Sequence, residues 1–177
     1  MRFSIALILL ILPLAVAAQG KPPSDLSISV SLTKTEKRKD SNSRQTTITL
    51  NGEKIVYERV YRGYRRNKIE PVHKEFVIKD EDIKRLEKLL REHNLLVSDS
   101  LKYPATARSF IYFEISLDVR SGGKQSHIDI SGPSKAVGIK DQKLYKNTRA
   151  LLEEIFRILN AQDEEISYED DLVIETP

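Results

Sequence analysis

The side chains most able to do chemistry in this sequence are its histidines, because the chain contains no cysteine. The histidines are His73, His93 and His127. The Gly122-Gly123 pair predicts a tight turn, which places His127 opposite Asp118 on the outward face of a sheet, with Asp129 two residues further along. A histidine between two carboxylates is typical of a weak divalent-metal site or of an exposed cross-strand ion pair. We favour the ion pair, because a metal site normally has roughly three or four convergent ligands.

Sequence signatures of the common catalytic sites are absent. The chain has no serine-hydrolase elbow, no zinc-protease helix motif and no glycine-rich nucleotide loop. The acidic residues Asp80 and Asp82 stand at the expected start of a helix, where they complement the helix dipole. We therefore predict no catalytic residue, no metal ligand and no cofactor, and we keep an unrecognised hydrolytic enzyme as the second alternative function.

The strongest positive signal is a basic segment between Lys34 and Lys74, where twelve basic and five acidic residues leave an excess of seven positive charges. Tyrosines interleave with the arginines in this segment, and both residue types are enriched in interfaces. The predicted binding residues are Arg59, Tyr61, Arg62, Tyr64, Arg65, Arg66 and Lys68. Such a strip suits an acidic protein, lipopolysaccharide or another anionic envelope polymer. The alternative interpretation is an ordinary solvated hairpin end.

The C-terminal segment has the opposite charge. Residues 163–177 contain seven acidic residues and no lysine or arginine. Attraction to the basic segment would dock this acidic tail on the domain. A disordered, solubilising tail is the other interpretation.

The first eighteen residues have the order of a secretory signal peptide: a basic start at Arg2, an apolar run, and small residues. We predict cleavage between Ala18 and Gln19, and cleavage after Ala17 suits the pattern nearly as well. The alternative is an uncleaved anchor, whose apolar run is short against the roughly 20 residues of a membrane span. Export without cysteine favours a bacterial periplasmic or secreted protein, with no membrane span after cleavage and no nucleic-acid partner.

The remaining chain predicts strands first. Apolar and hydroxyl residues alternate over 26–33, which is typical of a half-buried strand. Asn51-Gly52 predicts a type I′ hairpin that pairs Ile48 with Ile55. The residues expected on its core face are Ile48, Leu50, Ile55, Tyr57 and Tyr61. A short strand is expected at 73–78 with Phe76 and Ile78 inward, and a second hairpin is expected between 111 and 130.

Two helices are expected, one capped by Asp80 and closed by Asn94, the other capped by Asp141 and ending near Asn160. Their apolar residues recur at helical spacing on one face, so both helices should cover one face of the sheet. We predict an α+β fold with an antiparallel sheet of about five to six strands, formed from two hairpins. The single domain spans 26–162, after a linker at 19–25.

Several features from Phe76 onward share an order with a known family. They are a helix followed by LLVSD at 95–99, the strand Phe110–Phe113, the glycine turn, the strand with His127, and a closing amphipathic helix. This order resembles that of the emfourin family, small bacterial inhibitors of protealysin-type metalloproteases, over about half of the chain. The glycine-rich N-terminal signature of that family is missing here, and no functional residue is carried over.

The sequence therefore predicts an exported, non-catalytic binding module that engages an anionic envelope component or an acidic protein. The resemblance implies the first alternative, an inhibitor of a secreted protease.

Overall fold

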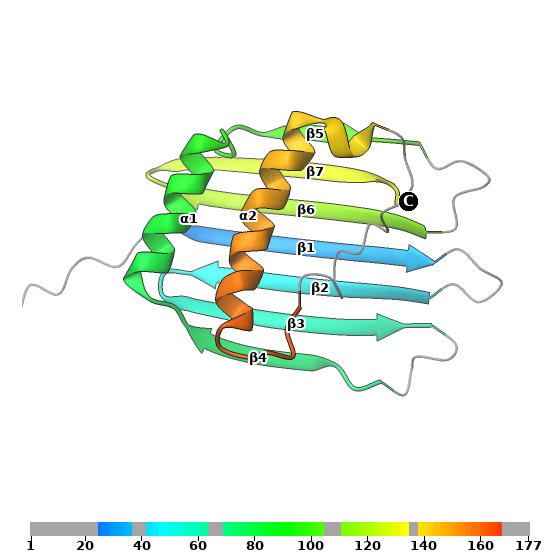
Figure 1. Cartoon of the computed structure of the whole chain (residues 1–177), viewed down its shortest axis with the longest axis horizontal. Coiled ribbons are helices and arrows are strands. Elements are labelled where there is room, and N and C mark those ends of the chain that lie inside the picture. The colour runs from blue at the N-terminus through cyan, green and yellow to red at the C-terminus, as the bar shows by residue number, and fades with distance from the viewer. Residues whose placement is uncertain (1–24, 37–41, 64–68, 105–110, 135–137, 168–177) are drawn as a thin grey trace, which may run out of the picture.

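The computed structural model describes residues 25–36, 42–63, 69–104, 111–134 and 138–167, which form one sheet with two helices on one face (Figure 1). The strands are β1 (Ser27–Glu36), β2 (Asn42–Asn51), β3 (Lys54–Arg62), β4 (Val72–Val77), β5 (Asp99–Lys102), β6 (Ile111–Ser121) and β7 (Lys124–Pro133). The helices are α1 (Asp80–Glu92) and α2 (Lys143–Asn160), with a short 3₁₀ turn, η1 (Ile139–Asp141). The α+β class predicted from the sequence is confirmed.

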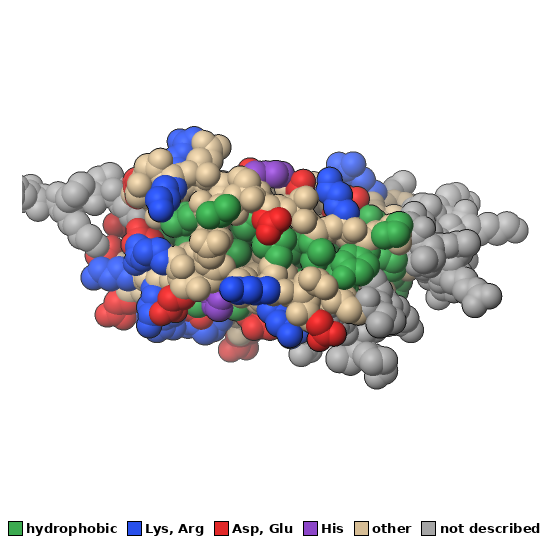
Figure 2. All heavy atoms as spheres, turned by 90° about the horizontal axis from the view of Figure 1, so that it is seen from above, with side chains coloured by type: hydrophobic (Ala, Val, Ile, Leu, Met, Phe, Trp, Pro, Cys, Tyr) green, Lys and Arg blue, Asp and Glu red, His purple; other side chains and the backbone are tan. Residues whose placement is uncertain are grey.

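The sheet has the strand order β4-β3-β2-β1-β6-β7-β5, so the described residues form seven strands rather than five to six. All neighbouring pairs are antiparallel except β5 and β7, which are parallel and make the sheet mixed. β5 was not among the strands expected from the sequence. The strand has only four residues, of which Leu101 alone is partly buried, so no alternating pattern marks it. Figure 2 views this edge, where hydrophobic side chains form a band between charged ones.

β1 is the central strand and confirms the alternation expected over 26–33. Its inward residues Ile28, Val30 and Leu32, and Leu26 just before it, are at most 3% exposed. Both neighbours, β2 and β6, pair with it along its full length. The alternation is clear because one face of this strand packs under the helices while the hydroxyl-bearing face is not covered by either helix (Figure 1).

The helices lie side by side across the strands (Figure 1). α1 ends as predicted, with Asn94 in the left-handed conformation at a φ of 56° and the Leu95 amide donating to the Leu90 carbonyl at 2.9 Å. Asp80 is the first helical residue rather than the cap, and no side chain caps this end. The acidic first turn instead complements the helix dipole.

α2 begins at Lys143, not directly after Asp141. Gly138, with a φ of 84°, turns the chain into η1, and extended Gln142 separates that turn, which contains Asp141, from the helix. The buried face of α2 is wide, because the helix lies over the middle of the sheet. Its buried residues are Tyr145, Thr148, Leu151, Leu152, Ile155, Phe156, Ile158 and Leu159.

The two hairpins differ in how well their registers were predicted. The β6–β7 hairpin turns at Gly122-Gly123 and pairs Asp118 with His127, as predicted. In the β2–β3 hairpin the turn residues are Gly52 and Glu53, so Ile48 pairs with Tyr57 instead of Ile55. Only Gly52 has a positive φ, which fits a type II′ rather than a type I′ turn. The register shift is an even number of residues, so Ile48 still shares the core face with Tyr57.

Among the residues that the structure describes, no helix has the length and apolar character needed to cross a bilayer. The predicted signal peptide, 1–18, and residues 19–24 of the predicted linker lie outside the described residues, as do residues 168–177 of the acidic tail.

Candidate functional site

A line of cationic side chains crosses the helix-bearing face of the sheet at the end where the inward apolar residues stop. We call this set the cation row; it consists of Lys34, Arg44, Arg59 and Lys74. Each member continues the inward alternation of its own strand: Lys34 follows buried Leu32 on β1, for example. The row therefore faces the same side as the core rather than the open face of the sheet.

The strand pairing places the four cations next to one another. Lys34 is directly opposite Arg44. Arg59 is opposite Thr46, which lies two residues from Arg44 on the same face of β2. Lys74 is opposite Tyr57, which lies two residues from Arg59 on the same face of β3. Direct cross-strand neighbours lie roughly 5 Å apart and diagonal ones roughly 7–8 Å apart. Like charges at these separations repel, so carboxylates beside the row are stabilising.

The middle of the row rests on aromatic side chains. The Arg59 guanidinium lies 5.5 Å from the ring centroid of fully buried Tyr57, a cation–π contact. Arg59 Nη1 also donates a hydrogen bond to the Tyr61 hydroxyl at 3.4 Å. Lys34, Arg44 and Arg59 are all partly buried. Partial burial reduces screening by water, so an anion bound here gains more than it would on an exposed surface.

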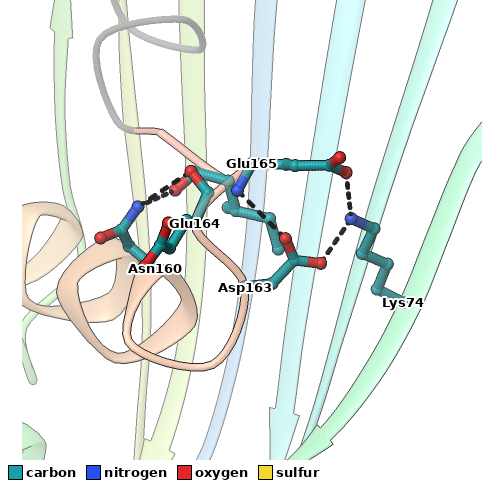
Figure 3. Close-up of polar contacts among 6 residues, drawn as sticks. Lys74, Asn160, Asp163, Glu164 and Glu165 are labelled. Carbon is teal, nitrogen blue, oxygen red and sulfur yellow. Dashed lines mark hydrogen bonds and ion pairs between the residues drawn. The ribbon is translucent and has the colours of Figure 1, made fainter.

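The Lys74 end of the row holds two carboxylates from the chain that follows α2 (Figure 3). Lys74 Nζ donates to Asp163 Oδ2 and, at 3.0 Å, to Glu165 Oε2. The hydrogen bond to Asp163 raises the pKa of Lys74, and the same bond lowers the pKa of Asp163. Both groups therefore stay charged near neutral pH.

The turn that presents these carboxylates is fixed from both sides. The Asn160 side chain at the end of α2 donates to the backbone carbonyls of Glu164, at 3.3 Å, and Ile166, at 3.0 Å (Figure 3). Ile166 itself is 0% exposed and belongs to the core. Residues 163–167 of the acidic tail therefore lie against the sheet, and the folded part continues beyond residue 162.

The structure separates the binding residues predicted from the sequence. Arg59 and Tyr61 face the helix side and adjoin the cation row, whereas Arg62 is exposed on the opposite face of β3. Tyr64, Arg65, Arg66 and Lys68 lie outside the described residues. Lys34, Arg44 and Lys74 were not among the predicted binding residues, because they lie far from one another in the chain and meet only through strand pairing. The alternation of inward and outward residues along each strand did indicate that these cations share the core-facing side of the sheet.

His127 makes the predicted cross-strand ion pair on the open face. Its Nδ1 lies 2.8 Å from Asp118 and its Nε2 lies 3.1 Å from Asp129, with about half of the side chain exposed. The hydrogen bond to Asp118 is the main cause that raises the pKa of His127, and the hydrogen bond to Asp129 adds to it. Each ring nitrogen faces a different carboxylate, so the carboxylates do not converge on one point. No group of acidic or histidine side chains within the described residues could hold a metal ion.

A similar arrangement, not predicted from the sequence, occurs at His73. Its Nδ1 lies 2.9 Å from Glu58 and its Nε2 lies 3.5 Å from Glu75. The hydrogen bond to Glu58 is the main cause that raises the pKa of His73. The ring nitrogens of both histidines are thus held between carboxylates.

The open face also has a shallow depression of about 260 Å³ over β1, β6 and β7. Its polar lining residues are Ser31, Thr33, Lys102, Glu114, Ser116, Asp129 and Ser131. Asp129 lines this depression and also pairs with His127.

No protein-family model matches the chain, and no curated protein matches it in sequence. The assignment of function therefore rests on the fold and on the charged residues described above.

Proposed function

We propose that the protein is an exported, non-catalytic binding module that holds an anionic partner through the cation row. The observation that carries this proposal is the Lys74 end of the row, where one lysine binds two carboxylates from a distant part of the chain. Arg59, Arg44 and Lys34 extend the same surface across three further strands. An acidic protein or an anionic envelope polymer offers a matching series of negative groups.

The spacing of the row supports an extended, acidic polypeptide as the partner. Alternate side chains of an extended peptide lie roughly 6.6 Å apart on one side. The cations of the row are separated by roughly 5 to 8 Å. Such a peptide crossing the strands would bring one acidic side chain to each cation in turn, and Tyr61 would add contact area beside Arg59.

The proposal is tested by neutralising the row and measuring retention on heparin and affinity for poly-L-glutamate. The variant Lys34→Gln/Arg44→Gln removes two charges from the row. The control Arg120→Gln/Lys124→Gln removes two charges from exposed positions near the β6–β7 turn. The row variant should elute from heparin at lower salt than the control and bind poly-L-glutamate at least tenfold more weakly. Equal shifts in the two variants would mean that only net charge matters, and the proposal would fail.

Inhibition of a secreted protease remains an alternative proposal. It rests on the resemblance in element order to the emfourin family that the sequence from Phe76 onward suggests. Incubation of the purified protein with a panel of secreted metalloproteases tests it. Inhibition that survives neutralisation of the cation row would favour this alternative over anion binding.

Export is proposed from residues 1–18. The intact mass of the protein from its native host is expected to begin at Gln19. A mass that retains Met1 would contradict cleavage and favour a membrane anchor.

A further inference from the structure

The depression on the open face of the sheet lies where small side chains meet across three strands. Ser31 on β1 is directly opposite Ser116 on β6, and Ser116 is opposite Asp129 on β7. Longer side chains, Glu114 and Lys102 among them, line the same depression of about 260 Å³. Neither helix covers this face (Figure 1). We propose that the depression is a binding site for a sugar unit of a neutral saccharide.

A second row of polar groups crosses the depression beside the first. Thr33, Glu114, Ser131 and Lys102 are paired in turn across β1, β6, β7 and β5. Glu114 and Lys102 are exposed and stand two strand spacings apart, or roughly 10 Å, with the Ser131 hydroxyl between them. A carboxylate only accepts and an ammonium only donates hydrogen bonds. The row therefore offers an acceptor at one end, a donor at the other and a hydroxyl in the middle.

This mixture of groups suits a ligand that has many hydroxyls. A hydroxyl both donates and accepts, so a sugar can satisfy the carboxylates, the lysine and the serines at the same time. Two of the lining groups are already held in place: Ser31 Oγ accepts a hydrogen bond from Gln45 Nε2 at 3.5 Å, and Asp129 is hydrogen-bonded to Ser116. Groups that are oriented before binding lose less entropy when a ligand arrives.

The charges around the depression favour a neutral ligand over a polyanion. Glu114 and Asp129 are acidic, and Lys102 is basic. His127 Nε2 lies 3.1 Å from Asp129, so at most one negative charge is left without a basic counterpart, whichever protonation state the histidine takes. A polyanion gains little from such a balanced set, in contrast to the cation row on the other face of the sheet.

Apolar ligands are disfavoured by the same lining. Its apolar residues, Ile115 and Ile130, are at most 2% exposed because their side chains point into the core. An apolar ligand would therefore cover polar groups without replacing their hydrogen bonds to water. Partly buried Tyr112 lies two residues from Glu114 on the same face of β6. Its ring offers apolar surface next to a hydroxyl, which suits a sugar ring that carries both C–H and O–H groups.

NMR titration of the ¹⁵N-labelled full-length chain tests the inference. The probes are three neutral tetrasaccharides: cellotetraose, maltotetraose and chitotetraose. At least one should give saturable amide shifts centred on Ser31, Ser116 and Ser131, and its affinity should stay the same as salt rises from about 50 to 300 mM, because the ligand has no charge to screen. The absence of saturable shifts with all three, or shifts centred elsewhere, would overturn the inference.

Variants that keep the net charge of the protein separate the site from general effects of charge. Glu114→Gln/Lys102→Gln removes one acid and one base, and it should weaken binding at least about fivefold because two charge-assisted hydrogen bonds become neutral ones. The control Glu53→Gln/Lys124→Gln makes the same exchange at exposed positions beside the two hairpin turns and should leave the affinity unchanged. Equal affinities of the two variants would contradict the site.

Filling the hollow is an independent test. Ser116→Leu should abolish saccharide binding, whereas Thr49→Leu, at an exposed position on the same face of β2, should not change it. The ¹⁵N spectrum of each variant shows that it is folded. Binding that survives in Ser116→Leu would place the saccharide outside the depression.

The inference and the proposed function can fail separately, because the two sites lie on opposite faces of the sheet. Lys34→Gln/Arg44→Gln should leave saccharide binding unchanged, and poly-L-glutamate should not compete with the saccharide. If this row variant abolishes saccharide binding, the depression is not the site. Loss of poly-L-glutamate binding in the same variant, with saccharide binding intact, supports both sites.

Discussion

The two charged clusters of the sheet differ in their balance of charge. On the open face, His127 lies between two carboxylates that come from the same hairpin, and about half of its side chain is exposed. On the helix face, four cations are neighbours across four strands, and the carboxylates that reach Lys74 come from 89 and 91 residues away. The histidine cluster draws its carboxylates from one hairpin, whereas Lys74 of the cation row draws both of its carboxylates from the chain after α2. Four cations at neighbouring positions on one face are what motivate the proposed binding surface.

The largest effect is expected from removing the apolar anchor of the acidic turn. Ile166→Ala deletes fully buried methyl groups and should lower the free energy of unfolding by about 2–5 kcal/mol. Val77→Ala, at a side chain that is 72% exposed, is the control and should change it by less than about 0.5 kcal/mol. Urea unfolding measures both. Equal values would mean that the turn is held by its ion pairs alone.

The next largest effect is expected at the Gly122-Gly123 turn, which sets the register that pairs His127 with Asp118. Gly123 has a φ of 73° with open space around it, so Gly123→Val is strained by backbone conformation and not by a clash. It should cost about 1–3 kcal/mol and weaken the pairing of His127 with Asp118. Urea unfolding measures the loss of stability, and NMR titration follows His127. An unchanged pKa and stability would show that the β6–β7 register does not depend on this turn.

The smallest effect is the pH dependence of the His127 cluster. Because its pKa is raised in the folded protein, His127 stabilises the fold fully below its unfolded pKa near 6.5, and this stabilisation is lost as pH rises through the folded pKa. His127→Gln should therefore cost about 0.2–1 kcal/mol at pH 5.5 and less at pH 8.5. His73 is present in both proteins, so its own titration cancels in the comparison. A cost that grows towards pH 8.5 would contradict the ion pair.

The sequence predicted those parts of the fold that have a regular pattern. The core face of β1, the left-handed end of α1 and the β6–β7 register follow from alternation, from Asn94 and from two adjacent glycines. The predicted β2–β3 register was wrong, because Asn51-Gly52 favours a type I′ turn whereas the chain turns one residue later, at Gly52-Glu53. The prediction missed β5, because the position of this strand is set by its pairing with β7 and not by a pattern in its own residues.

The candidate site was predicted less well than the fold, for a physical reason. Charge counting along the chain selected the segment that contains the cation row, but it grouped Arg59 with Arg62, which a strand places on opposite faces. Lys34 and Arg44 become neighbours only through the β1–β2 register. The contacts of Lys74 with Asp163 and Glu165 join segments far apart in the chain, which no local pattern encodes.

The most direct test of the cation row is to map where an acidic ligand binds. A ¹⁵N-labelled chain ending at Ser167 would be titrated with poly-L-glutamate at low salt, and amide shifts would be followed by NMR. The account predicts that the largest shifts fall on residues around Lys34, Arg44, Arg59 and Tyr61, and that they disappear in the Lys34→Gln/Arg44→Gln variant. Shifts centred on Arg62 or on the His127 cluster, or spread evenly over the surface, would contradict it.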